Sequence, residues 1–313
     1  MNAPEQVDPV QFTDYYGRPV LKVTRWKSPH MPGYLFLGGL SGAASTMAAA
    51  AEATGRPRLA RQGRLTAAVA AVGGAGLLVA ELGRPERFLN MLRVFKPSSP
   101  MSVGSWILAA HGGVTTAAAA STVTGVAPRA GRAAVAVSAV TGPLVATYTG
   151  VLLADTAVPA WHAAHRHLPP LFAGSALAAA GGAAMVMVPV AAAGPARRAA
   201  LLGALAELAV TASLERGQGF GEEPRLVSEP YRIGRAGTLL RAARLLAVAG
   251  AAGTALAAGR HRAAAVAAGA ALLAGSACTR FGVYHAGVLA GRDPKYTVVP
   301  QRARPRVQES RPG

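Results

Sequence analysis

Six polar side chains that lie in or beside long apolar stretches are the residues of this chain that could carry chemistry. They are His30, Glu81, His111, Tyr148, Asp155 and Glu207. Ionisable groups are costly in the hydrocarbon of a membrane, so those that occur there usually face a cavity or a partner. Tyrosine and histidine donate hydrogen bonds to carbonyl groups, and histidine exchanges protons near neutral pH. This combination suits a quinone, which requires an apolar slot, a donor at each carbonyl oxygen and a route for protons.

The apolar stretches that position these residues predict an all-α integral membrane protein. The chain is 51% hydrophobic and only 15% charged, which is too apolar for an ordinary soluble protein of 313 residues. We expect a polar N-terminal segment at 1–32, a transmembrane bundle at 33–290 and a basic tail at 291–313. Eight segments are long enough, or nearly so, to cross about 30 Å of hydrocarbon. They cover residues 33–54, 65–81, 103–124, 134–154, 171–193, 199–215, 238–258 and 263–281.

A shorter helix is expected between the second and third spans, over Pro85–Phe95. Its apolar residues recur at the i, i+3, i+4, i+7 spacing of one helix face, and basic residues rim that face. This pattern is typical of a helix lying in the membrane interface or of a docking surface for a partner, although a packed connector helix fits it equally. The apolar positions are Phe88, Met91, Leu92 and Phe95, and the basic ones are Arg87, Arg93 and Lys96.

The net charge of +18 could suggest a nucleic-acid partner, but the basic residues are dispersed over loops between apolar segments. Eight spans place both termini on one side of the membrane, which we call face A; the opposite side is face B. The face B loops are short and purely basic, a pattern typical of the cytoplasmic side. We therefore expect a multi-pass protein of a bacterial plasma membrane, with extracytoplasmic termini and no nucleic-acid partner. The basic residues of face B are Arg56, Arg58, Arg61, Arg64, Arg129, Arg132, Arg197, Arg198, Arg260 and Arg262.

The polar residues inside the spans gather toward face A, which predicts one polar pocket that opens there. His30 precedes the first span and Tyr148 lies near the face A end of the fourth. His111 is about eight residues into the third span, roughly 12 Å deep at 1.5 Å per residue. Only Glu207 lies near the middle of the bilayer. We expect a proton path drawn from Glu81, His111, Asp155 and Glu207.

The single cysteine restricts the redox centres that this chain could hold. Cys278 lies inside an apolar segment, so internal disulfides, cysteine-ligated iron–sulfur clusters and covalent haem are excluded. No phosphate-binding glycine motif lies in a soluble domain. Redox centres are then supplied by partner subunits, or by a b-type haem for which His111 and His285 are the one plausible pair of ligands.

Four stretches of the sequence resemble the NrfD/PsrC family of membrane subunits. The most specific lies within Glu81–Leu108 and reads LGRPERF followed by KPSSPMSVGSW. HMPGYLFLGGLSG at His30–Gly42 resembles the first spanning helix of that family, and YTGVLLADTAVPAW at Tyr148–Trp161 resembles the fourth. GRDPKYTVVPQR at Gly291–Arg302 resembles its C-terminal tail. Together the four stretches extend over the chain from end to end.

The resemblance implies a quinone-reactive membrane anchor of a molybdoenzyme-type complex, such as a polysulfide reductase or a formate dehydrogenase complex. Such an anchor passes electrons between an iron–sulfur ferredoxin-like subunit and the quinone pool, while a molybdopterin subunit carries the catalytic core. The resemblance also implies menaquinone near face A, with contacts at His30 and Tyr148. Lys27 and Ser28 stand where the family has an asparagine nearby, which puts one carbonyl contact in doubt.

Docking of the iron–sulfur partner is expected on face A, over the Pro85–Phe95 helix and the Arg216–Arg235 loop, with Arg87 and Arg93 contributing charge. Two other functions use the same polar residues. One is a cytochrome-b-like haem-binding anchor, and the other is a proton-translocating transporter or channel. A transporter commonly has helices broken by glycine or proline in corresponding halves, and Pro143 and Pro189 are too isolated to supply that pattern.

Overall fold

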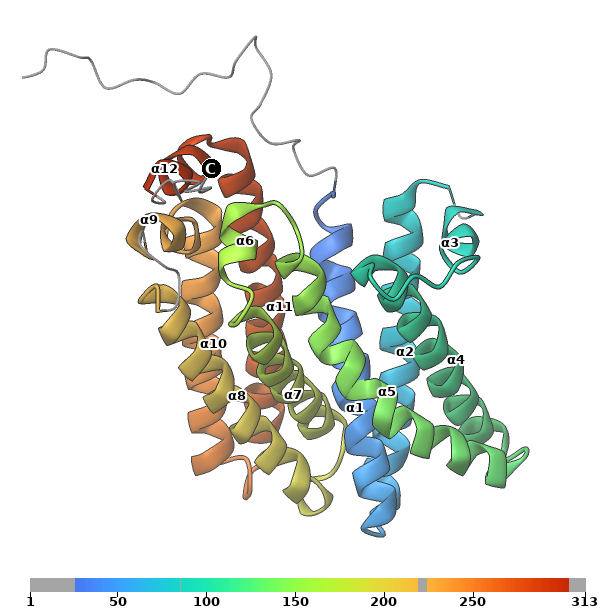
Figure 1. Ribbon diagram of the computed structural model, residues 1–313. Helices are drawn as coiled ribbons and strands as arrows, with labels where there is room; N and C mark the ends of the chain where they lie inside the picture. The colour runs from blue at the N-terminus through green and yellow to red at the C-terminus, as the bar shows by residue number, and fades with distance from the viewer. Residues whose placement is uncertain (1–25, 85, 219–223, 304–313) are drawn as a thin grey trace, which may run out of the picture.

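The structure is a computed structural model that describes residues 26–84, 86–218 and 224–303 (Figure 1). These residues form twelve α-helices and no strand, as the composition predicts. Eight helices have 20 or more residues. They are α1 (His30–Ala53), α2 (Pro57–Leu82), α4 (Pro100–Thr124), α5 (Pro128–Ala154), α7 (Leu168–Met187), α8 (Gly194–Glu215), α10 (Gly234–Leu256) and α11 (Arg262–Arg292).

The long helices run up and down side by side, and both ends of the described chain lie at the same end of the bundle (Figure 1). We identify this end with face A. The short helices are also at this end (Figure 1). Two 3₁₀ turns lie in the connections: η2 (Val190–Ala192) joins α7 to α8, and η3 (Glu229–Tyr231) precedes α10. The short helices are α3 (Glu86–Met91), α6 (Pro159–Ala163), α9 (Pro224–Ser228) and α12 (Lys295–Ala303).

Six of the described helices are long and apolar enough to cross a membrane: α1, α2, α5, α7, α10 and α11. The sequence predicts about eight spans. Helix α4 has the length, but serine, threonine and glycine lower its hydropathy, and α8 carries Arg197, Arg198, Glu207 and Glu215. Large apolar side chains on the outside of the bundle, including Val69, Val140 and Leu245, are two-thirds exposed or more, as expected of a surface that contacts lipid.

Several helices extend past the segments that hydropathy delimits. Helix α2 begins at Pro57 rather than 65, and α11 continues to Arg292 rather than 281. A segment delimited by hydropathy ends at the first charged residues, whereas the backbone hydrogen bonds of the helix continue beyond them. Helix α7 ends earlier than expected, at Met187, because Pro189 cannot continue it and holds Val188 in extended backbone. Arg262 Nη1 then donates to the terminal carbonyls of Met185 and Val188 (2.8 Å each).

The expected helix over Pro85–Phe95 is shorter in the structure. Helix α3 ends at Met91, and Pro85 lies outside the described residues. The chain beyond Met91 leaves the helix because Ser102 of α4 binds it: the Ser102 hydroxyl donates to Val94 O and accepts from Lys96 N, both at 3.0 Å. Phe95 therefore does not continue the apolar face of α3; its ring packs edge-on against Trp106, with centroids 6.3 Å apart.

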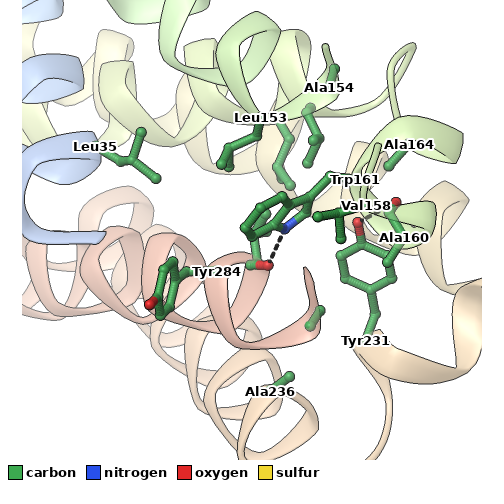
Figure 2. Packing of buried hydrophobic residues seen from close by; sticks show 14 of the residues in the cluster. Leu35, Leu153, Ala154, Val158, Ala160, Trp161, Ala164, Tyr231, Ala236 and Tyr284 are labelled. Atoms are coloured by element: carbon green, nitrogen blue, oxygen red, sulfur yellow. Dashed lines mark hydrogen bonds between the residues drawn. The ribbon is translucent and has the colours of Figure 1, made fainter. Parts of the chain in front are cut away.

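Trp161 fastens α6 into the core near face A (Figure 2). Its indole is fully buried, and Nε1 donates to Val283 O of α11 at 2.8 Å. Tyr231 of η3 donates its hydroxyl to Ala160 O at 2.9 Å, which ties the same short helix to the start of α10. A Cβ at Gly287 would overlap the Trp161 ring, so this contact requires glycine there. The short helices at face A are thus packed parts of the bundle.

Glycine pairs bring helix backbones into contact elsewhere. A Cβ added to Gly142 of α5 would lie 2.5 Å from Gly42 O of α1, and one added to Gly269 of α11 would lie 2.5 Å from Gly182 O of α7. Small residues allow such approach where lipid provides no hydrophobic drive for helix association. Not every glycine serves this purpose, since a Cβ at Gly113 would meet nothing within 4 Å.

Substituting Gly42 tests this packing. In Gly42→Ala the new methyl group would overlap Gly142 O, so α1 and α5 must separate. Overpacking of this kind costs about 1–3 kcal/mol. We expect a lower thermal unfolding midpoint for the detergent-solubilised protein. Gly113→Ala is the matched control, because its methyl group enters open space and alanine favours the helix. Equal midpoints for both variants would contradict close contact of the two backbones.

Candidate functional site

A cavity of about 260 Å³ lies at the face A end of α1, α2, α4 and α5, beneath α3. Its walls are mostly apolar, and five side chains with polar groups reach it from five different helices: Tyr34, Glu81, Arg87, Ser105 and Tyr148. An apolar pocket with a few convergent polar groups is the usual form of a small-molecule site. The apolar walls include Trp26, Met31, Leu78, Leu82, Met101 and Leu108.

Tyr148 lies on α5 with its ring against the backbone of α4. A Cβ at Gly104 would overlap the ring, so the glycine makes room for the tyrosine. The Tyr148 hydroxyl donates to Pro100 O, in the first turn of α4, at 2.7 Å. Its oxygen keeps lone pairs free, and a carbonyl entering the cavity would compete with Pro100 for the proton.

Glu81 connects this cavity to His30. The Glu81 carboxylate accepts from Lys27 N at 2.8 Å, and its second oxygen lies 3.4 Å from His30 Nδ1. The His30–Glu81 contact lacks the alignment of a hydrogen bond and becomes an ion pair when the imidazole is protonated. The His30 side chain is 34% exposed, whereas that of Glu81 is 8% exposed. His30 does not itself line the cavity, so the two residues form a chain from the surface inward.

His111 is fully buried between three helices. Ser41 of α1 donates its one hydroxyl proton to Ala67 O at 2.7 Å, so it must accept from His111 Nε2, 2.9 Å away. Thr141 of α5 lies 2.9 Å from Nδ1, which accepts in this neutral tautomer. Both ring nitrogens therefore have neutral partners, and His111 links α1, α4 and α5 one turn deeper than Leu108 of the cavity wall.

Glu207 belongs to a second buried polar cluster, between α7, α8 and α11. Its carboxylate accepts from Thr279, and Ser175 is also within hydrogen-bond reach. Arg280, the residue after Thr279, attracts Glu207 electrostatically. The Arg280 guanidinium is fully buried, donates from Nη2 to Phe172 O at 2.7 Å and from Nε to Leu35 O at 3.4 Å, and lies 3.8 Å over the Phe172 ring.

Arg280 is not among the site residues that the sequence predicts, because the eighth apolar segment, 263–281, ends beside it. In the structure α11 continues for twelve residues past Arg280, to Arg292. The sequence contains a signal for this, since FGVYHAGVLAG after Arg280 carries no Asp, Glu, Lys or Arg. An arginine followed by three apolar turns is deep in a span rather than at its end.

The remaining predicted residues lie at the surface of face A. Asp155 caps the end of α5, is exposed and does not line the cavity. Arg93 is also exposed, and its side chain has no polar partner in the described part of the chain. Arg87 lines the cavity and donates to Leu82 O at 3.3 Å. The structure thus brings His30, Glu81, Arg87 and Tyr148 to one region and leaves Asp155, Arg93 and Glu207 outside it.

Face A also carries an ionic contact that fastens α12. Lys295 Nζ lies 3.1 Å from Glu229 Oε2, and the Tyr296 hydroxyl donates to the same oxygen at 2.9 Å. Burial by itself would raise the pKa of Glu229, but the hydrogen bonds from Lys295 and Tyr296 outweigh it and lower that pKa. The link is therefore present at neutral pH and is lost as the pH falls through the lowered pKa.

A comparison with known families gives one match. The sequence model described as Polysulphide reductase, NrfD matches residues 22–216. This range contains every residue that lines the cavity and also Glu207, and it ends before α10 and α11. A search of curated proteins finds no match.

Removing Arg280 tests the buried cluster. Arg280→Met keeps an apolar stem but leaves Phe172 O, Leu35 O and Glu207 without their donor or counter-charge. Breaking a buried charged pair in this way costs about 3–5 kcal/mol. We expect much less folded protein extracted from membranes and a lower unfolding midpoint. Arg93→Met, which removes an exposed arginine, is the control. A midpoint for Arg280→Met that equals the control would show that the guanidinium does not hold the helices.

Proposed function

Because the chain belongs to the NrfD polysulphide reductase family, we propose that it is the quinone-reactive membrane anchor of an oxidoreductase complex. The cavity at face A carries this proposal. It combines apolar walls with the Tyr148 hydroxyl and the Glu81 carboxylate, and it is closed on one side by α3, where a partner subunit could dock. Reduction of a quinone consumes two electrons and two protons, so both an electron donor and a proton source must reach the site.

The residues of this chain would bind the quinone, orient it and supply its protons. Tyr148 would turn its hydroxyl from Pro100 O to a carbonyl oxygen of the ring, while Met31, Leu78 and Leu108 hold the ring by apolar contact. His30 would collect protons at the surface and pass them to Glu81, which faces the cavity. In this arrangement His30 acts through Glu81 and not by direct contact with the ring.

The electrons would come from an iron–sulfur ferredoxin-like subunit on face A, itself supplied by a molybdopterin subunit. Helix α3 and the segment after it present exposed Val94, Phe95 and Arg93 on that face. Because Arg87 and Met91 of α3 line the cavity, a partner seated on α3 would lie directly above the site. Face A would be extracytoplasmic, since the basic loops are at face B.

A haem-binding anchor is less consistent with the geometry. An axial histidine needs a free ring nitrogen, and both nitrogens of His111 already have hydroxyl partners within 2.9 Å. His285, on α11, has no hydrogen-bond partner at Nε2 among the described residues, but without His111 it lacks the second histidine of the pair that a b-type haem would need. Quinone is therefore the cofactor we propose, and menaquinone is the type that the family resemblance favours.

Tyr148→Phe tests the quinone site while keeping the ring that fills the space over Gly104. A lost neutral hydrogen bond costs about 0.5–1.5 kcal/mol, which corresponds to a roughly two- to tenfold slower turnover of a quinone analogue. Reduction of a soluble artificial acceptor by the intact complex should be unchanged. The assay compares the two rates in the same preparation.

Tyr231→Phe is the matched control, because it also removes a tyrosine hydroxyl bonded to a backbone carbonyl, at 2.9 Å from Ala160 O, but away from the cavity. Glu81→Gln should slow quinone-linked turnover as well, by removing the acid that faces the cavity. Wild-type quinone rates for both Tyr148→Phe and Glu81→Gln, with the complex intact, would place the site elsewhere.

We further propose that α4 and α8 cross the membrane, which gives eight spans. Both helices have more than 20 residues and pack beside candidate spans, α4 against α2 and α5 and α8 against α7 and α10. Glu207 of α8 is buried against Thr279 of α11, and Glu215 pairs with Arg244 of α10 at the bundle surface. The low hydropathy of α4 and α8 is compatible with crossing if neighbouring helices cover their polar sides.

Labelling of single cysteines tests this topology in a Cys278→Ala background. Ser98→Cys and Val126→Cys flank α4, and Ala191→Cys and Gln218→Cys flank α8; all four positions are exposed. If both helices cross, the two cysteines of each pair should react with a membrane-impermeant maleimide from opposite sides. Labelling of both members of a pair from the same side would reduce the number of spans.

A further inference from the structure

A second, larger cavity lies at the opposite end of the bundle, at face B. It has a volume of about 540 Å³ and runs between α1, α5, α7 and α8. Its walls are apolar, formed by residues such as Met47, Ala146 and Leu177, and it passes Pro143 in the middle of α5. Nothing in the quinone proposal uses this cavity.

The threonines in its wall do not make it polar. Thr46 donates its hydroxyl to Gly42 O at 2.9 Å, Thr54 to Ala50 O at 2.7 Å and Thr147 to Pro143 O at 2.8 Å. Each hydroxyl is thus satisfied by its own helix. A ligand of this part of the cavity would be a hydrocarbon chain, because no polar group in the wall remains to be bonded.

Two arginines stand at the rim of the same cavity. Arg56 precedes α2 and Arg198 lies in the first turns of α8, and both line the cavity and are exposed. Neither side chain has a hydrogen bond or an ion pair within the described residues. Other face B arginines are used internally: Arg64 pairs with Glu52, and Arg197 donates to Val190 O at 2.8 Å.

We propose that this cavity binds one anionic phospholipid, with its phosphate between Arg56 and Arg198 and an acyl chain along Met47, Pro143 and Leu177. Guanidinium groups bind phosphate oxygens through paired hydrogen bonds, and an anion between two arginines also relieves their mutual repulsion. Basic pockets between spanning helices recognise lipid headgroups by the same chemistry. The lipid would fill the space that the bundle leaves along α1, α5, α7 and α8.

Binding of phosphatidylglycerol and phosphatidylcholine by the detergent-purified protein, compared by native mass spectrometry, tests this proposal. We expect wild type to retain phosphatidylglycerol in preference to phosphatidylcholine, with one lipid dominating. Arg56→Gln with Arg198→Gln should reduce bound phosphatidylglycerol at least fivefold. Arg129→Gln with Arg132→Gln is the matched control, because it removes two exposed face B arginines that do not line the cavity, and should retain binding.

A third variant tests the apolar part of the site. Ala50→Trp places a large ring in the cavity from an exposed position, so it should displace the acyl chain without disturbing the core. The phosphatidylglycerol bound to Ala50→Trp should fall as much as in the Arg56→Gln/Arg198→Gln variant. Equal losses of bound phosphatidylglycerol in the Arg56→Gln/Arg198→Gln variant and in the Arg129→Gln/Arg132→Gln control would overturn the proposal, since they would indicate a general attraction of face B for anionic lipid. Equal retention of the two lipids by wild type, or unchanged binding in Ala50→Trp, would overturn it too.

Discussion

The need to satisfy one buried guanidinium governs how the centre of this bundle is arranged. Arg280 cannot release its charge in a protein and is fully enclosed, so its partners must come from neighbouring helices. They are Leu35 O of α1, Phe172 O and the Phe172 ring of α7, and the carboxylate of Glu207 on α8. Gly39 is small where the guanidinium passes, since a Cβ there would lie 3.1 Å from Nη2. Three helices, α1, α7 and α8, are thus fixed around one side chain of α11.

Helix α1 connects this buried cluster to the cavity at face A. Tyr34 lines the cavity, and the carbonyl of the next residue, Leu35, accepts from Arg280. One turn and a half further along α1, Ser41 bonds His111. A displacement of α1 would therefore move contacts at the cavity, at the Arg280 cluster and at His111. Polar groups that are far apart in the sequence share one rigid element, and this arrangement holds the cavity in shape without a ligand.

Residue patterns predicted the helical class, most of the long helices and the gathering of His30, Glu81 and Tyr148 toward face A. These follow from hydropathy and from counting helix ends, which depend on local sequence. What the patterns missed depends on tertiary contacts. Ser102 draws the chain out of α3 after Met91. Arg280 was overlooked because a charged residue was read as the end of a span, although partners on three other helices make its burial tolerable.

The dense glycine and alanine packing has a consequence for how the chain is made. Leucine, isoleucine, phenylalanine and valine favour transfer of a segment from the translocon into lipid. Helices α4 and α8 are instead rich in alanine, with serines and threonines in α4 and charges in α8. As single segments they would partition weakly, yet α4 packs closely on α5 and α8 on α7. If α4 and α8 cross as proposed, biogenesis would proceed by hairpins: α4 would stay near the translocon until α5 enters the bilayer beside it, and α8 would enter against α7, which precedes it in the chain.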